Sequence, residues 1–262
     1  MNAASLDRRL AVGEALVRES ASLAMGFFKR RETLAITSKG RQDMASEADL
    51  AVERLIRDRL AREFPEDAFF GEETGRADIG GARCLWVVDP IDGTQPFICG
   101  LNGWCVSIAL LVDGVITAGF VASPVRDEVF IGGRDFGATL NGTPIRVSSA
   151  TALDQGIVGV GYSPKVKPAD FLPMLTKLLM QGAMFYREGS GALTLCSVAA
   201  GRLIGYVEQL VMSYDVAGAL AVLEGAGGIS NDFLAGEALW NGNRLIAGPP
   251  AIYPALAACF PE

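Results

Sequence analysis

The segment WVVDPIDGT, residues 86–94, constrains this chain more than any other. Its apolar start predicts the end of a buried strand, which Pro90 is expected to stop. Asp89 and Asp92 are then expected in the loop beyond the strand end, where sheet proteins usually keep their chemistry. Two carboxylates this close repel each other unless a positive charge lies between them.

The absence of histidine narrows the chemistry that this chain can perform. Without imidazole there is no Ser-His-Asp triad, no Cys-His pair and no histidine zinc site. Carboxylates prefer hard cations such as magnesium, calcium or manganese. The 23 basic and 30 acidic residues give a net charge of −7 without a basic stripe, so nucleic acid is not expected as a partner of the bulk surface.

The order of the expected elements predicts the fold class. Apolar periodicity predicts helices over residues 4–30 and from Ser46 to before Pro65. Strands are expected at 106–112 and 115–122 around an Asp113-Gly114 turn, at 129–131, and at 145–147 after an Asn141-Gly142 turn. From 151 onward, strands at 157–160, 204–208 and 245–247 alternate with helices at 169–181, 190–200 and 215–226 and after Pro254. We therefore predict an α+β fold, a layered αβαβα sandwich.

The same order predicts two halves within this sandwich. Residues 1–150 are expected to form an antiparallel sheet with helices and to carry most of the candidate site. Residues 151–262 are expected to form a smaller mixed sheet with helices that completes the site.

The cysteines and the N-terminus predict where the protein resides. The five cysteines form no C-x-x-C pair and are predicted to be buried thiols in a reducing compartment. Asp7, Arg8 and Arg9 occupy the place where a signal peptide needs an apolar run. The uncharged window at 93–112 is interpreted as loop plus strand rather than a membrane helix. A cytoplasmic protein without a membrane partner is expected.

The spacing of Asp89 and Asp92 separates two chemical hypotheses. Aspartyl-phosphate phosphatases also follow an apolar strand with acidic residues, but in their D-x-D-x-T motif the two lie two positions apart. Here the gap is three, across Pro-Ile, which favours two carboxylates turned toward a shared cation.

Further carboxylates stand in similar contexts. FFGEET (69–74) runs into Glu72 and Glu73, and SYDVAGA (213–219) places Asp215 at the start of a helix. Each has an ordinary alternative, namely a solvated turn for the glutamates and an N-cap for Asp215. Together with DPIDGT, they favour one shared cation site.

These motifs resemble those of a known family. GEE, W-x-V-D-P-I-D-G-T and x-D-V-A-G-A are similar, in order, to the three metal-binding motifs of the inositol monophosphatase-like, lithium-sensitive, magnesium-dependent phosphatases. DMASEAD at 43–49, GFVASPVRDEVFIGG followed by GATLNG, EGAGG at 224–228 and NRLIAGPP at 243–250 extend the resemblance over nearly the whole chain.

The resemblance implies a phosphomonoesterase acting on a small phosphorylated alcohol, most similar to inositol monophosphate, through metal-activated water. It also implies two to three Mg²⁺ ions, with Mn²⁺ as a possible substitute, lithium inhibition and a homodimer. Paired cations about 3.5–4 Å apart suit this slow hydrolysis because they clamp both the attacking and the leaving oxygen.

The resemblance also assigns metal ligands in this sequence. It implies that Glu72, Asp89 and the backbone carbonyl of Ile91 hold the first Mg²⁺. Asp89, Asp92 and Asp215 would hold the second, with Asp89 bridging, and Glu72 would reach a third ion through water.

Catalytic and substrate-binding roles follow from the same resemblance. Asp49 and Thr94 would orient the attacking water, with the Thr94 hydroxyl passing a hydrogen bond to Asp49, and Glu72 is also a candidate catalytic group. The N–H groups of Gly93 and Thr94 would meet the phosphate, more effectively if they open a helix. The alcohol part of the substrate would be contacted by Asp92, Glu208, Gly189, Ser190 and Gly191.

Several of these residues have a second interpretation that the sequence leaves open. Ser46-x-x-Asp49 is also a capping box, a role compatible with catalysis. Glu208 is either a substrate contact or a surface carboxylate, and Glu73 is expected to lie behind the ligands or in solvent. Lys39 is predicted on a glycine-containing loop, which either closes over the metals or is an ordinary mobile loop.

Three departures from the family pattern concern the substrate rather than the metals. Tyr214 replaces a common tryptophan, Thr194 replaces a commonly acidic residue, and QPFICGL (95–101) is closer to members acting on histidinol phosphate or 3′-phosphoadenosine nucleotides. Those two activities are the alternatives. A hypothesis of another class is a macromolecule-binding protein with vestigial phosphatase activity.

Overall fold

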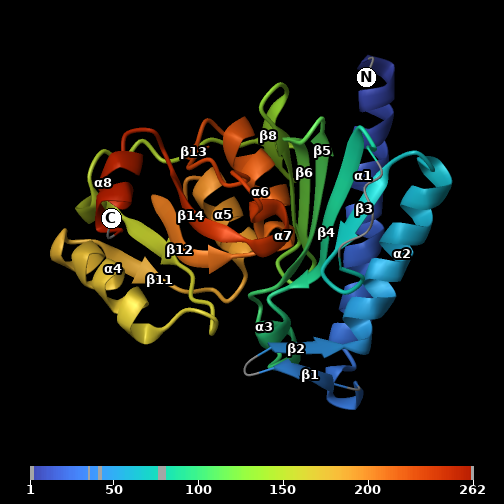
Figure 1. Ribbon diagram of the computed structural model, residues 1–262, viewed down its shortest axis with the longest axis horizontal. Coiled ribbons are helices and arrows are strands. Elements are labelled where there is room, and N and C mark those ends of the chain that lie inside the picture. The colour runs from blue at the N-terminus through green and yellow to red at the C-terminus, as the bar shows by residue number, and fades with distance from the viewer. Residues whose placement is uncertain (1–2, 35, 41–42, 76–80, 261–262) are drawn as a thin grey trace.

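The computed structural model describes residues 3–34, 36–40, 43–75 and 81–260. Two sheets stand side by side, with helices outside each and between them (Figure 1). The outer layers are α4 and α8 on one side and α1 and α2 on the other, and α5 and α6 fill the middle. The predicted αβαβα sandwich is thus confirmed.

The larger sheet has the strand order β3-β4-β5-β6-β7-β8-β9 and is antiparallel except for the parallel pair β3 and β4. Its strands are β3 (Ala68–Gly71), β4 (Cys84–Asp92), β5 (Cys105–Val112), β6 (Val115–Ser123), β7 (Glu128–Gly133), β8 (Gly137–Leu140) and β9 (Thr143–Pro144). The turn between β5 and β6 has φ of 52° at Asp113 and 81° at Gly114, as a type I′ turn requires.

One strand of this sheet was predicted in the wrong place. A strand was expected at residues 145–147, but β9 comprises only Thr143–Pro144. Pro144 has no N–H to donate, and the chain leaves the ladder after Ile145 donates to the carbonyl of Ala138 (3.0 Å).

Two long helices cover the outer face of the larger sheet (Figure 1). They are α1 (Ala3–Phe28) and α2 (Glu47–Glu63), close to their predicted bounds. Their apolar faces join one core cluster with the sheet, which includes Leu16, Val17, Val52, Ile56 and Trp86.

A buried ion pair ties α1 to the beginning of β3. Arg9 donates to both carboxylate oxygens of Asp67, at 2.8 and 2.6 Å, and the Trp86 indole N–H donates to the same carboxylate at 2.9 Å. The guanidinium of Arg9 also lies 4.5 Å from the Phe64 ring centroid. Both charged side chains are almost completely buried, so this contact fixes the helix on the sheet.

The smaller sheet is mixed, as predicted, with the order β11-β10-β12-β14-β13. Its strands are β10 (Ile157–Val160), β11 (Met184–Tyr186), β12 (Gly205–Val211), β13 (Ile229–Ser230) and β14 (Asn243–Gly248). The pairs of β10 with β11 and β12 are parallel, and those of β14 with β12 and β13 are antiparallel. Its helices are α4 (Pro168–Met180) and α8 (Tyr253–Cys259) on the outside and α5 (Gly191–Ala199) on the inside.

Helix α6 (Ser213–Gly225) lies against the inner face of the larger sheet. Nine of its 13 residues are buried, which is typical of a helix enclosed between two layers. A Cβ on Gly119 of β6 would lie 1.8 Å from the carbonyl oxygen of Gly218, so glycine at this position permits the close approach of helix and strand.

Shorter elements complete the chain. They are β1 (Ile36–Gly40), β2 (Asp43–Ser46), α3 (Thr94–Ile98), α7 (Ala238–Asn241) and two 3₁₀ turns, η1 (Arg31–Thr33) and η2 (Leu153–Gln155). Lys39 was predicted on a loop, but its backbone lies in β1, which pairs with β2. Residues 41–42 of that expected loop lie outside the described residues.

The structure bears on two predictions, that the cysteines are buried and that no helix spans a membrane. Cys84, Cys105, Cys196 and Cys259 are buried as expected, but Cys99 is exposed because it follows α3 on the surface. Among the described helices, none combines the length and apolarity needed to cross a bilayer.

Candidate metal centre

Strand β4 does not stop at Pro90, contrary to the sequence prediction. It continues to Asp92, and Asp89 and Asp92 lie in the strand rather than in a loop beyond it. Asp89 pairs with Ser107 and Asp92 with Cys105, so β4 carries one more residue than β5 between these pairs. Such a bulge accommodates proline because the ladder is already interrupted there.

The structure brings six acidic side chains into two groups of three. Oxygens of Asp89, Asp92 and Asp215 lie within 4.8 Å of one another, and so do oxygens of Asp49, Glu72 and Glu73. Glu73, expected behind the ligands or in solvent, lies in the second group. The strand end of β4, the turn after β3 and the starts of α2 and α6 supply these residues.

Asp92 is held by the N-terminus of α5. Ser190, the N-cap residue, donates its hydroxyl to Asp92 Oδ2, and the Ala192 N–H donates to the same oxygen at 2.7 Å. The Gly191 N–H donates to Oδ1 at 3.3 Å. Burial raises the pKa of Asp92 to about 6, and these hydrogen bonds oppose that rise.

The pKa values of the carboxylates near Asp92 are strongly raised. Burial, followed by the negative charge of Asp92, raises the pKa of Asp215 to about 8. Burial together with the charges of Glu72, Asp92 and Asp215 raises the pKa of Asp89 well above its usual range. Three carboxylates in one buried volume cannot all ionise without a positive charge among them, so this group fits a cation.

Asp49 forms the capping box predicted from the sequence, and its catalytic role stays a prediction. One oxygen, Oδ2, accepts from the Ser46 N–H at 2.8 Å and from the Ser46 hydroxyl at 2.7 Å, which completes the capping box. The other, Oδ1, is buried and has no hydrogen-bond partner among the described residues. Burial raises the pKa of Asp49 to about 6. An orphaned carboxylate oxygen beside two further carboxylates fits an oxygen-ligated cation.

The segment after Asp92 turns sharply into α3. Gly93 has φ of 90°, and a Cβ there would lie 2.4 Å from the carbonyl oxygen of Gly103. Thr94 opens the short helix, as anticipated. Its hydroxyl donates to the Ile91 carbonyl at 3.1 Å, so its predicted hydrogen bond to Asp49 is absent from the described contacts. The phosphate contacts of Gly93 and Thr94 stay predictions.

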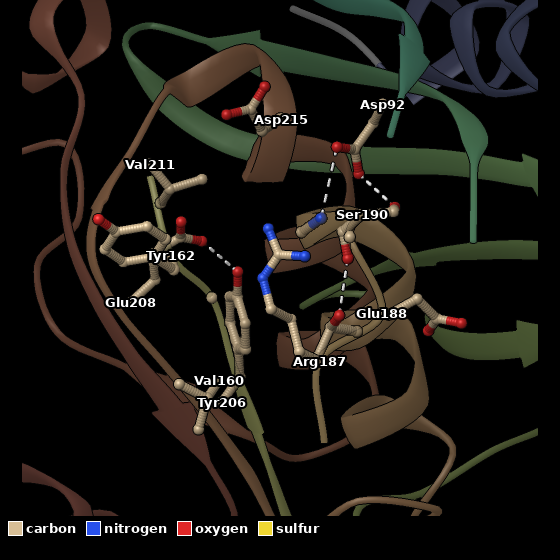
Figure 2. A pocket seen from close by; sticks show the side chains of 14 residues that line it. Asp92, Val160, Tyr162, Arg187, Glu188, Ser190, Tyr206, Glu208, Val211 and Asp215 are labelled. Carbon is tan, nitrogen blue, oxygen red and sulfur yellow. Dashed lines mark hydrogen bonds between the residues drawn. The ribbon is translucent and has the colours of Figure 1, made fainter. Parts of the chain in front are cut away.

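A small cavity of about 130 Å³ adjoins Asp92 and Asp215 (Figure 2). Of the predicted substrate contacts, Gly189, Ser190, Gly191 and Glu208 line this cavity. It therefore joins one of the acidic groups to the residues predicted to contact the alcohol.

Glu208 lies inside this cavity rather than on the surface. It is buried on β12 and accepts a hydrogen bond from the Tyr206 hydroxyl. Burial raises the pKa of Glu208 to about 7, while the Tyr206 hydrogen bond and Arg187 oppose the rise. The alternative of a surface carboxylate is wrong because β12 is an interior strand of its sheet.

Arg187 is a site residue that the sequence did not indicate. Its guanidinium points into the cavity (Figure 2), and no other described residue that lines the cavity carries a positive charge. Neighbouring Glu188 forms an ion pair with Arg126 and so connects the same loop to the larger sheet. Neither residue stands in a distinctive motif, so no local sequence signal identifies them.

Comparisons with known proteins identify the family of this chain. The chain matches the model of the inositol monophosphatase family over residues 5–262. Among curated relatives, the Nus factor SuhB of Haemophilus influenzae is 34% identical over 238 residues, which are 90% of this chain and 89% of that protein. The Nus factor SuhB of Escherichia coli K12 is 33% identical over 243 residues, 92% and 91% of the two chains.

Solved structures show the same fold. The extragenic suppressor protein SuhB from Bartonella henselae superimposes with a TM-score of 0.89 at 28% identity, covering 97% of this chain and 98% of that one. The inositol monophosphatase from Anabaena (Nostoc) sp. PCC 7120 gives a TM-score of 0.84 at 27% identity, with 97% and 96% covered. An inositol monophosphatase from Zymomonas mobilis gives 0.80 at 31% identity, with 99% of each chain covered. This chain belongs to the inositol monophosphatase family.

Proposed function

We propose that this protein is a magnesium-dependent phosphomonoesterase that hydrolyses a small phosphorylated alcohol, most similar to inositol monophosphate. The observation that carries the proposal is the convergence of two acidic groups, one of which contains the orphaned Oδ1 of Asp49. Family membership supports the same chemistry.

In this proposal, Glu72, Asp89 and the Ile91 carbonyl would hold one Mg²⁺, and Asp89, Asp92 and Asp215 would hold another. Glu72 would also serve a third ion, and Mn²⁺ would substitute for Mg²⁺. When bound, these ions neutralise the phosphate and lower the pKa of the attacking water. Ser190 and the α5 amides keep Asp92 oriented toward the other ligands.

The remaining catalytic steps use groups of the chain itself. Asp49 Oδ1 accepts a hydrogen bond from the attacking water, because its other oxygen is already occupied by Ser46. Thr94 supplies a hydroxyl to the same water, and the Gly93 and Thr94 amides face the phosphate. Glu72 serves as the further catalytic carboxylate.

The alcohol part of the substrate would occupy the cavity. Asp92 and Glu208 accept from its hydroxyls, and Gly189, Ser190 and Gly191 form the wall. A cavity of about 130 Å³ favours a compact alcohol such as a cyclitol or amino alcohol. Histidinol phosphate and 3′-phosphoadenosine nucleotides are the alternative substrates, on the wording of residues 95–101.

The deciding experiment is phosphate release from a small panel in the presence and absence of Mg²⁺. The panel contains inositol-1-phosphate, histidinol phosphate, fructose-1,6-bisphosphate and 3′-phosphoadenosine 5′-phosphate. We expect magnesium-dependent release, fastest from inositol-1-phosphate. No release from any compound would overturn the proposal.

A second candidate function follows from the relatives called Nus factor SuhB. In that function the protein binds a macromolecule and its phosphatase activity is vestigial. The expectation from the sequence was that nucleic acid does not bind this protein. The comparisons do not support that expectation, and the proposal does not include it. A stoichiometric partner in a pull-down, combined with negligible phosphate release, would favour this function.

Four further properties complete the proposal. They are lithium inhibition, a homodimer, a cytoplasmic location, and a division into residues 1–150 with most metal ligands and residues 151–262 that complete the site. Inhibition assays with LiCl, light scattering and cell fractionation test the first three. Expression of the two halves as separate fragments tests the fourth.

A further inference from the structure

The turn that presents Glu72 and Glu73 is fixed through its backbone. It follows β3 and comprises residues 71–75. The Glu72 N–H donates to the Val88 carbonyl of β4 at 3.1 Å, and the Gly75 N–H donates to the Gly71 carbonyl at 3.0 Å. The N–H groups of Glu73 and Thr74, which lie between them, point toward α2, and a side chain of that helix supplies their acceptor.

Glu53 supplies that acceptor. Its Oε2 accepts from the Glu73 N–H and its Oε1 from the Thr74 N–H, both at 2.8 Å. Glu53 is only 1% exposed, so the accepting carboxylate is shielded from water. Hydrogen bonds to a charged acceptor are roughly twice as strong as neutral ones.

The turn is shaped to admit this carboxylate. A Cβ on Gly71 would lie 2.3 Å from Glu53 Oε2 and 2.4 Å from its carboxyl carbon. Only glycine at this position lets the glutamate reach the two amides. The contact therefore depends on complementary residues of β3 and α2, which is not expected of a chance encounter.

The position of Glu53 on α2 connects this turn to the metal centre. Asp49 precedes it by four residues, so the two carboxylates lie on the same face of the helix, one turn apart. Asp49 enters the acidic group directly, and Glu53 holds the backbone that carries the other two members, Glu72 and Glu73. One helix face thus sets the relative positions of all three carboxylates.

We infer that Glu53 is a positioning residue for the divalent cations that Glu72 would hold. It does not touch an ion, but it fixes the turn on which Glu72 stands. This inference rests on the proposed function, because that function assigns Glu72 to the cations. Residues that orient metal ligands typically contribute about 10–100-fold to metal affinity or activity.

Glutamate is needed here rather than glutamine. A glutamine side chain has one carbonyl oxygen and one NH₂ group, and the NH₂ would face a backbone N–H. In Glu53→Gln, one of the two amides therefore loses its acceptor and the turn shifts. In Gly71→Ala, the glutamate is pushed away from the same amides by the new methyl group. The two variants disturb one contact from opposite sides.

The test measures Mn²⁺ and Mg²⁺ binding by titration calorimetry on the full chain, alongside thermal midpoints in EDTA and steady-state kinetics. We expect Glu53→Gln and Gly71→Ala each to weaken cation binding about 10–100-fold and to raise the Mg²⁺ concentration for half-maximal rate equally. At saturating Mg²⁺, kcat should recover to within about threefold. Asp58→Asn, which removes an exposed carboxylate from the same helix, is the control and should leave binding unchanged.

The outcomes separate this inference from the proposed function. If the wild-type chain binds neither ion, the proposed metal centre is wrong and this inference fails with it. If the wild-type chain binds and both variants bind equally well, Glu53 has only a structural role. Should Glu53→Gln not fold, Gly71→Ala decides: unchanged affinity overturns the inference, and weakened affinity with an intact thermal midpoint supports it.

Discussion

The Ser190 hydroxyl donates a hydrogen bond to the carboxylate of Asp92, which lies 98 residues earlier in the chain. This contact joins the N-cap of α5 to the bulged end of β4. The contact therefore joins the candidate metal centre to the cavity that β12 of the smaller sheet helps to line. Changes on either side of this junction should have separable effects on metal binding, alcohol binding and stability.

Asp92→Asn should abolish turnover while the fold is retained. The amide keeps one oxygen to accept from the donors of α5, places an NH₂ group where the other oxygen was, and removes a charge that a cation needs. We expect kcat to fall by at least about 100-fold, measured as phosphate release at saturating Mg²⁺. Asp113→Asn is the matched control, because Asp113 is exposed in a hairpin turn where asparagine is equally suitable. A fully active Asp92→Asn enzyme would refute the assignment.

The stability of the metal-free protein should decrease as pH rises. The pKa values of Asp49, near 6, and Asp215, near 8, lie above the ordinary value of 3.8 because of burial. The folded state thus favours the protonated carboxyls, and their stabilising contribution is complete below about pH 4 and is lost as pH rises through 6 to 8. Thermal midpoints in EDTA should fall across this window.

Magnesium should reverse this trend, because cation binding displaces the protons. At 100 times the dissociation constant, a bound ion adds about 2.7 kcal/mol, or roughly 5–10 °C in thermal midpoint. This increment should be larger at pH 8 than at pH 5.5. A midpoint in EDTA that is flat or rising from pH 5 to 8 would contradict the prediction.

Glu208→Gln should affect binding of the alcohol more than the chemical step. Glu208 lines the cavity and accepts from Tyr206, away from the acidic group of Asp49. We expect KM for inositol-1-phosphate to rise about tenfold, with kcat within about twofold. Because the pKa of Glu208 is raised to about 7, the wild-type KM should improve as pH rises through 7, and this dependence should vanish in the variant.

Arg187→Gln should discriminate between substrates. As the only cationic side chain among the described residues that line the cavity, Arg187 is suited to a second anionic group on the alcohol part. We expect KM to rise about 10–100-fold for fructose-1,6-bisphosphate and less than about threefold for inositol-1-phosphate. Arg187→Lys should retain part of the preference. Equal losses for both substrates would place the guanidinium on the scissile phosphate instead.

Asp67→Ala should destabilise the fold and leave the kinetics intact. Without the Asp67 carboxylate, the buried Arg9 guanidinium and the Trp86 N–H lose their shared acceptor. Breaking a buried pair in this way costs about 3–5 kcal/mol, measured by urea unfolding. KM and kcat at a temperature where the variant is folded should match the wild type. A loss below about 1 kcal/mol would show that the pair contributes little.

The sequence anticipated features that short motifs encode. Asp113-Gly114 favours a hairpin through its backbone conformation alone. The close spacing of the acidic residues in GEET and DPIDGT indicates a cation site. The predicted strand end at Pro90 was wrong because proline occurs both at strand ends and in bulges. Only the pairing of β4 with β5 distinguishes the two cases. That pairing is not written in the local sequence.

The burial of Glu208 could have been predicted from the sequence. Tyr206 and Glu208 are two residues apart on β12 and so face the same side of the sheet, where both side chains are buried. Glu53 and Arg187 could not have been found in this way. Their roles depend on backbone amides and cavity walls that come from distant parts of the chain.

The two sheets contribute different parts of the site, and this has a consequence for engineering. The wall that faces the alcohol is formed by residues 187–191 and β12, whereas Asp89 and Asp92 belong to β4 of the other sheet. A chimera that takes residues 184–211 from a relative with another preference, and keeps a serine at 190, should inherit the donor's choice of alcohol. Such a graft leaves the acidic residues of β4 and α6 in place, and the retained serine at 190 preserves the hydrogen bond to Asp92.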